Sequence, residues 1–193
     1  LFVIIASVFF ASGMYNFVVV MNGTDYMFER AGLGDYQVVT MGEYAIGKLE
    51  ETVKAIPEVS GYSIDEVVYV SKGDVLAEDG TKLEVTNIGM LDSIDRLGIT
   101  FFDKDDNAIT SVEPGTVIVT GSFFRLNNLE EGDKITISKG DAEATLTVAG
   151  ILKDAVFGSE FMGNPRFLVN ESDFVKFIEE ETVFQYYCGE LFY

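Results

Sequence analysis

Hydrophobic residues are concentrated at the N-terminus of the chain. Residues 1–21 (LFVIIASVFFASGMYNFVVVM) carry no charge, and at about 1.5 Å per residue a helix of this length crosses the ~30 Å hydrocarbon layer of a membrane. A signal peptide and a buried core helix are the alternatives, but a signal peptide has a basic start and a shorter apolar stretch. The pattern predicts a transmembrane helix at 1–24, followed by a stalk or connector at 25–35.

Further along the chain, helix and strand patterns alternate. Apolar residues recur every three or four positions over 46–56, which predicts a helix that stops at Pro57. Asn170 is a good N-cap for a second helix at 171–181. A short helix is expected at 122–128. Strands are predicted at 36–41, 66–71, 83–88, 100–102, 117–120, 134–138, 144–152, 167–169 and 183–187.

These elements predict an α+β fold. Residues 36–193 are expected to form one mixed α/β domain with a β-rich inserted subdomain, preceded by the transmembrane or stalk helix. The larger α/β part covers about 36–70 and 160–193, and the insertion covers about 71–159. If the run 183–187 completes a sheet with the strand at 36–41, Cys188 lies at a strand end as a structural thiol.

The charge balance excludes several classes of function. The chain has 13 basic and 32 acidic residues and a formal net charge of −19, so it has no positive surplus for nucleic acid or for docking flat on anionic lipid. It contains no histidine, which removes the commonest general base and most zinc and haem sites. A single cysteine permits no internal disulfide.

One acidic segment has the start of a calcium-binding loop. Asp103, Asp105 and Asn107 stand at its first, third and fifth positions, but Ala108 replaces the turn glycine and Pro114 replaces the final glutamate. A solvated turn between two strands is the better interpretation. The chain also has no glycine-rich phosphate loop, so we expect no ATP binding. We assign no catalytic, cofactor-binding or metal-ligating residue, expect no cofactor, and predict that the chain is not an enzyme.

Three segments occur in an order typical of one family. They are residues 113–120 (EPGTVIVT), 129–137 (LEEGDKITI) and 146–154 (LTVAGILKD), and they follow an apolar helix. This arrangement resembles the extracytoplasmic MacB-like core domain of ABC transporter permeases of the MacB/FtsX/LolE type. One departure is Thr116, where the family often has Glu.

The resemblance implies a permease subunit in the cell membrane, with the acidic domain extracytoplasmic. Such a subunit dimerises and pairs with a separate ABC ATPase, whose cycle moves the membrane helices. The outer domain couples that motion to substrate export or extraction, or to partner regulation, and its partner is a protein, a peptide or a lipid. A membrane-anchored binding or sensor domain with a single helix is the alternative. A secreted carboxylate-based hydrolase is a third hypothesis, but no constellation of residues supports it.

Overall fold

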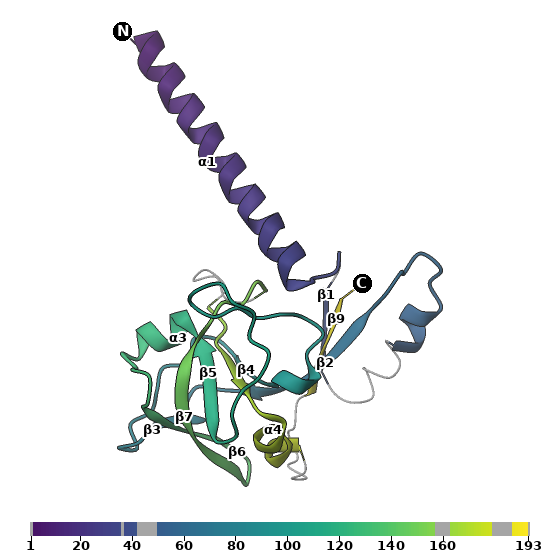
Figure 1. The fold of residues 1–193 in the computed structure, drawn as a ribbon, viewed down its shortest axis with the longest axis vertical. Coiled ribbons are helices and arrows are strands. Elements are labelled where there is room, and N and C mark those ends of the chain that lie inside the picture. Colours follow the sequence, from purple (N-terminus) through teal and green to yellow (C-terminus); the bar gives the residue numbers. More distant parts are fainter. Residues whose placement is uncertain (1, 36, 42–49, 157–162, 179–186, 193) are drawn as a thin grey trace.

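The computed structural model describes residues 2–35, 37–41, 50–156, 163–178 and 187–192. A long helix, α1 (Phe2–Ala31), projects from a domain built of one curled β-sheet with short helices (Figure 1). The predicted α+β class, with an N-terminal apolar helix before the domain, is confirmed.

Helix α1 has 30 residues, which corresponds to about 45 Å. It is long and apolar enough to cross a membrane, and no residue of its most apolar stretch is buried in the domain. The helix continues past Met21 to Ala31, so the stalk or connector predicted at 25–35 is helical as far as Ala31. Residues 25–31 include several good helix formers and no proline. The helix therefore continues through them, although polar and apolar residues are mixed there.

The helix ends at a glycine that closes its last turn. Gly32 has a φ of +74°, a conformation that costs glycine little. Its N–H donates to the Glu29 carbonyl (3.2 Å), and the N–H of Leu33 donates to the Phe28 carbonyl (3.0 Å). This pair of hydrogen bonds is a Schellman motif, which fixes the direction in which the chain leaves the helix.

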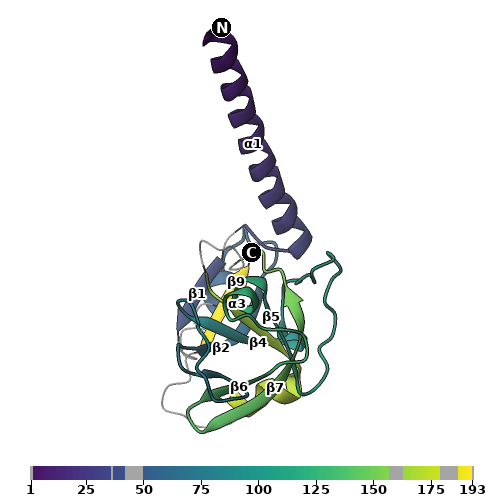
Figure 2. The same ribbon diagram turned by 90° about the vertical axis from the view of Figure 1, so that its left-hand side faces the viewer.

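Among the described residues, the sheet has nine strands in the order β1-β9-β2-β4-β8-β5-β7-β6-β3. The pairs β4–β8 and β5–β7 are parallel, and the others are antiparallel. Figure 2 shows the strands curling beneath the projecting helix. The strands are β1 (Gln37–Met41), β2 (Ser63–Val70), β3 (Val75–Ala77), β4 (Gly89–Ser93), β5 (Thr116–Thr120), β6 (Lys134–Lys139), β7 (Ala142–Leu152), β8 (Arg166–Val169) and β9 (Tyr187–Phe192).

The inner face of the sheet holds the main core. Helices α3 (Gly121–Leu126) and α4 (Glu171–Ile178) cover this face. Phe167 of β8 is fully buried there, and its ring meets the edge of the Phe123 ring at 4.9 Å between centroids. Alternate residues of β2, β5 and β7 complete this core.

The outer face is covered by the long connection from β4 to β5, which contains a short 3-10 helix, η1 (Ile94–Arg96). Ile99, Phe101 and Val112 of this connection pack with Leu168 of β8. Because both faces are covered, all four residues of β8 are buried. A bulge at Gly150, where the β5–β7 register shifts, turns Leu152 to this outer core.

The turn at Pro114 and Gly115 joins two parts of the fold. Gly115 has a φ of +76°, and its N–H donates to the buried carboxylate of Asp173 (2.6 Å). This bond ties the start of β5 to the first turn of α4, where Asn170 caps the helix as predicted. The motif therefore has a structural role of its own, independent of any resemblance.

Most predicted elements are confirmed, with β1, β2, β5, β6, β7, β8, α3 and α4 near the expected positions. The strands predicted at 83–88 and 100–102 are wrong. Residues 83–88 form an irregular connection, and of residues 100–102 only Phe102 takes part in isolated bridges, with Ala108 and Lys153. Strands β3 and β4 were not predicted. Of the helix predicted at 46–56, the described residues 50–54 are helical, and Ile56 is exposed. Most of 183–187 lies outside the described residues.

Strand β9 pairs with β1 and places Cys188 opposite Met41, near the start of the strand. This pairing was predicted for the run 183–187, but the observed strand begins at Tyr187. On its other side it pairs with β2. One sheet thus includes strands from both the larger part and the insertion proposed from the sequence.

Candidate functional site: the joint between helix and domain

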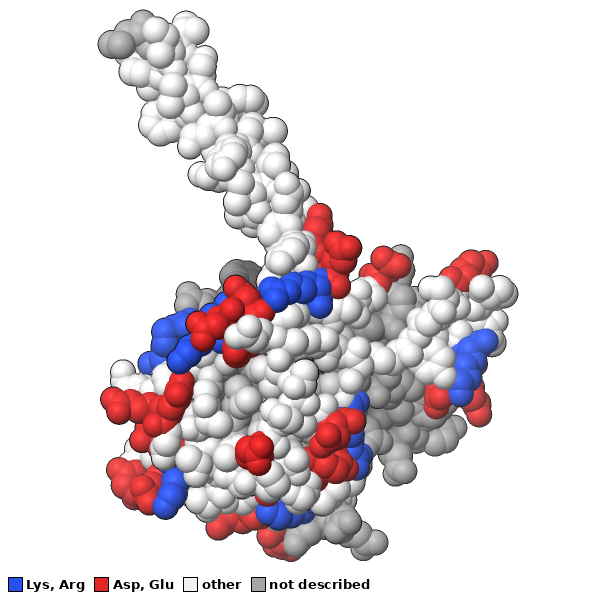
Figure 3. Space-filling model, in the orientation of Figure 1, with Lys and Arg blue, Asp and Glu red and all other residues white. Residues whose placement is uncertain are grey.

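The end of α1 is built into the domain. Ala31 is 1% exposed, and its carbonyl accepts a hydrogen bond from the N–H of Thr100 (2.8 Å). Leu33, just beyond the helix, packs against the outer core. Figure 3 shows the contrast between the uncharged shaft of the helix and the acidic and basic groups around its base. These contacts attach the helix to the β4–β5 connection.

Arg30 is the centre of this joint. Its guanidinium carbon lies 4.3 Å from the centroid of the Phe102 ring and 5.9 Å from that of Tyr26, one turn earlier on α1. Nη2 also donates to the backbone carbonyl of Asp106. A guanidinium over aromatic rings contributes about 0.5–2 kcal/mol per contact. Arg30 therefore joins the helix to the connection by stacking and by a hydrogen bond.

The receiving loop, residues 103–107, forms a tight turn between Phe102 and Ala108, as predicted. The Asp103 carboxylate accepts hydrogen bonds from the N–H groups of Asp105 (2.8 Å) and Asn107 (2.9 Å). Bonds from the side chain and backbone of Asn107 hold the pKa of Asp103 below its ordinary value. Lys153 pairs with Asp106 at 2.7 Å. The acidic side chains thus shape the loop that receives Arg30.

A buried ionic cluster lies under the same connection. Arg166 of β8, 1% exposed, donates from Nη1 to Asp92 (2.8 Å) and from Nε to Asp154 (2.7 Å). Its guanidinium carbon lies 4.9 Å from the centroid of the Phe101 ring. Removing three charges from water costs several kcal/mol per ion unless each is paired. The cluster therefore joins β8 to β4 and to Asp154, which follows β7, and it contacts the covering connection at Phe101.

These contacts form a continuous path from the helix to the sheet. Arg30 contacts Phe102, the next residue Phe101 contacts Arg166, and Arg166 binds β4 through Asp92. The backbones of Phe102 and Lys153 also exchange two hydrogen bonds, at 2.7 and 3.4 Å. Packed groups therefore connect the end of α1 to the centre of the sheet.

Sequence patterns alone point to none of Arg30, Phe102 or Arg166. Arg30 and Asp106 are 76 residues apart, and Arg166 and Asp92 are 74 apart. No spacing motif connects them. The only local signal was at Arg166, a basic residue next to a predicted strand. It did not indicate a buried cluster, because arginine is rarely buried.

Arg30→Gln is expected to loosen the joint, because glutamine keeps one donor but loses the stacking on both rings. In a Cys188→Ser background, spin labels at Val18→Cys and Glu143→Cys should give a distance distribution about twofold broader. The free energy of unfolding should fall by less than about 2 kcal/mol. Arg125→Gln, on α3, is the control. An unchanged distribution in Arg30→Gln would contradict the assigned role.

A second ionic contact ties η1 to α4. Glu171 accepts hydrogen bonds from the Arg96 guanidinium (2.6 Å to Nη2) and from the Ser93 hydroxyl (2.6 Å). The Arg96 bonds are the main reason that the pKa of Glu171 lies below its ordinary value of 4.5. A carboxylate with a lowered pKa stabilises the folded state above its ordinary pKa, and this contribution disappears as pH falls through the folded value.

Glu171→Gln should therefore lower the free energy of unfolding at neutral pH and have little effect in acid. Both side chains are roughly a third exposed, so the expected loss is only about 0.5–1 kcal/mol. Urea unfolding of both proteins between about pH 7 and pH 3 measures the difference. A difference that stays constant across this range would show that the ionised pair is not its source.

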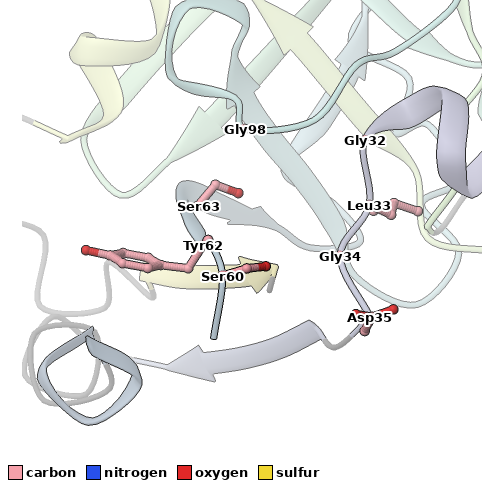
Figure 4. A pocket seen from close by; sticks show the side chains of 9 residues that line it. Gly32, Leu33, Gly34, Asp35, Ser60, Tyr62, Ser63 and Gly98 are labelled. Carbon is pink, nitrogen blue, oxygen red and sulfur yellow. The ribbon is translucent and has the colours of Figure 1, made fainter. Parts of the chain in front are cut away.

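A cavity of about 430 Å³ lies beside the joint, lined by residues 32–35 and 60–63 and by Gly98. Its lining is mainly glycine, serine and backbone, with the side chains of Tyr62 and Asp35 (Figure 4). Within the described part of the chain, no three acidic or cysteine side chains gather as a metal site. A lining of this composition suits polar contacts with its backbone N–H and C=O groups.

No protein-family model matches this chain, and no curated protein matches it. Its function is therefore inferred from its own sequence and geometry.

Proposed function

We propose that the chain is part of a permease subunit of an ABC transporter, with its domain inserted between membrane helices on the outer side of the membrane. The observation that supports this proposal most strongly is the position of β9. This strand runs antiparallel to β1, and Phe192 lies opposite Gln37, just after α1 (Figure 1). The last described strand thus ends beside the residues at which the chain enters the domain.

This arrangement is what an inserted domain requires. A domain between two membrane helices must return its chain toward the membrane, whereas a domain on a single anchor has no such constraint. Strand β9 lies between β1 and β2, so the returning segment is an inner strand paired on both sides. The path from Arg30 to Arg166 gives the domain a means of following movements of α1.

The partners follow from the same proposal. A separate ABC ATPase on the cytoplasmic side supplies the movement, a second permease subunit completes a dimer, and an outer protein, peptide or lipid is moved or regulated. The acidic surface suits neither nucleic acid nor anionic lipid.

The test is reconstitution of the full-length protein in nanodiscs with the ABC ATPase encoded beside it. The pair should form a stable complex, and ATP hydrolysis by the ATPase should change at least about threefold on assembly. Arg30→Gln should reduce that change, while Arg125→Gln should not. A full-length protein with one membrane segment and no effect on an ATPase would favour the single-helix sensor.

A further inference from the structure

The last turns of α1 carry two exposed aromatic side chains, just beyond the charge-free part of the helix. Tyr26 is 59% exposed and Phe28 is 42% exposed, and Asp25, the first charged residue of the chain, directly precedes them. Tyrosine is enriched where a membrane helix leaves the hydrocarbon layer, because its ring is apolar and its hydroxyl is polar. If α1 crosses a membrane, residues 25–29 therefore lie among the lipid headgroups.

The joint holds part of the domain at the same level. Arg30 stacks on Phe102, and its Nη2 donates to the carbonyl of Asp106, so the loop 103–107 lies beside the last turn of α1. From Asp25 to the end of α1 the helix rises only about 9 Å, and the headgroup layer is about 5–8 Å thick on each side of a bilayer. In Figures 1 and 2 the helix leans over the domain. The loop is therefore at the outer boundary of the headgroup layer.

The charges of this region select the kind of lipid. We call residues 25–31 and 103–107 the joint face, which contains five carboxylates and two cationic groups. The side chains of Asp25, Glu29 and Asp105 are exposed. Anionic headgroups are repelled by this acidic surplus. A zwitterionic phospholipid carries its ammonium group outermost, so its surface is complementary to exposed carboxylates.

We propose that the joint face contacts the headgroups of zwitterionic phospholipids. The carboxylates of Asp25, Glu29 and Asp105 face the ammonium groups. The rings of Tyr26 and Phe28 lie between neighbouring headgroups. This inference rests on the proposed function, because it requires α1 to cross the membrane. The lipid contact gives the domain a second support beside the joint and limits its tilt relative to the membrane.

Fluorescence quenching measures this contact in the full-length protein with Cys188→Ser, reconstituted in nanodiscs of phosphatidylcholine. A fluorophore is attached at Asp105→Cys or, as the matched control, at Glu143→Cys. Both native residues are exposed acids, but Glu143 lies in the β6–β7 hairpin, at the end of the domain away from α1 (Figure 1).

A nitroxide on the lipid headgroup should quench the label at Asp105→Cys at least about threefold more than the control label, because the quencher is confined to the thin headgroup layer. In nanodiscs of phosphatidylglycerol at low salt, the acidic surplus is repelled, and the quenching at Asp105→Cys should fall to less than about half. Equal quenching at the two positions, or stronger quenching at Asp105→Cys in phosphatidylglycerol, would overturn the contact.

A third label, at Val18→Cys in the apolar part of α1, separates this inference from the proposed function. A nitroxide on the lipid acyl chain should quench it if the helix lies in the hydrocarbon layer. If Val18→Cys is quenched and Asp105→Cys is not, the lipid contact alone is wrong. If Val18→Cys is not quenched, both proposals fail.

Discussion

Arg166→Met is expected to destabilise the domain by about 3–5 kcal/mol, because it leaves Asp92 and Asp154 buried without their cation. Both carboxylate side chains are fully buried in the cluster. Methionine has a similar length but cannot donate a hydrogen bond. The measurement is urea unfolding of the chain in detergent, followed by tyrosine fluorescence.

The triple variant Asp92→Asn, Asp154→Asn, Arg166→Met separates charge from packing. It removes all three charges, and we expect it to recover at least about 2 kcal/mol of the loss. Lys72→Met, which breaks an exposed pair with Glu84, should cost less than about 1 kcal/mol. If the single Arg166→Met variant were as stable as Lys72→Met, the buried cluster would not hold the connection to the sheet.

Phe167→Ala is expected to lower the free energy of unfolding by a similar amount, about 3–5 kcal/mol, since it removes a fully buried ring from the main core. The same unfolding measurement applies. Phe124→Ala, at a half-buried position of α3, is the control and should cost less than about half as much.

The packing of Phe167 against Gly89 of β4 can be tested with a second pair of variants. A Cβ at residue 89 would lie 2.8 Å from Cε2 of Phe167, so Gly89→Ala alone should cost about 1–3 kcal/mol. In the Phe167→Ala background the closest of these contacts is gone, and the added methyl meets only the Val70 carbonyl oxygen at 3.2 Å and the Val70 Cβ at 3.3 Å. The double variant should therefore be more stable than the sum of the two losses predicts. Strict additivity would contradict the close approach of β4 to Phe167.

The parts of the fold that the sequence predicted are those with local causes. The charge-free run of α1, the Asn170 cap and the turn at 103–107 depend on neighbouring residues. Strand β4 (GMLDS) was missed because its glycine, aspartate and serine have low β propensity. The position of β4 depends instead on its pairing with β2 and β8 and on the ion pair between Asp92 and Arg166.

The joint could not be predicted for a related reason. Arg30 is an ordinary basic residue at a helix end, which its favourable interaction with the helix dipole already explains. Its contacts with Phe102 and Asp106 exist only once the β4–β5 connection has folded over the outer face. At Leu83 and Val85 the error is the opposite one, a predicted strand that does not form. The alternation of these residues is typical of a strand, but they are buried in a connection between strands.

Cysteine labelling in intact cells tests the central claim most directly, namely that α1 crosses the membrane and that the chain returns to it after an outer domain. The full-length protein would carry Cys188→Ser and one new cysteine, either Glu143→Cys on β7 or a site beyond the next apolar segment. A membrane-impermeant maleimide should label Glu143→Cys in intact cells and the second site only after permeabilisation. Labelling of Glu143→Cys only after permeabilisation, or of both sites from outside, would contradict the account.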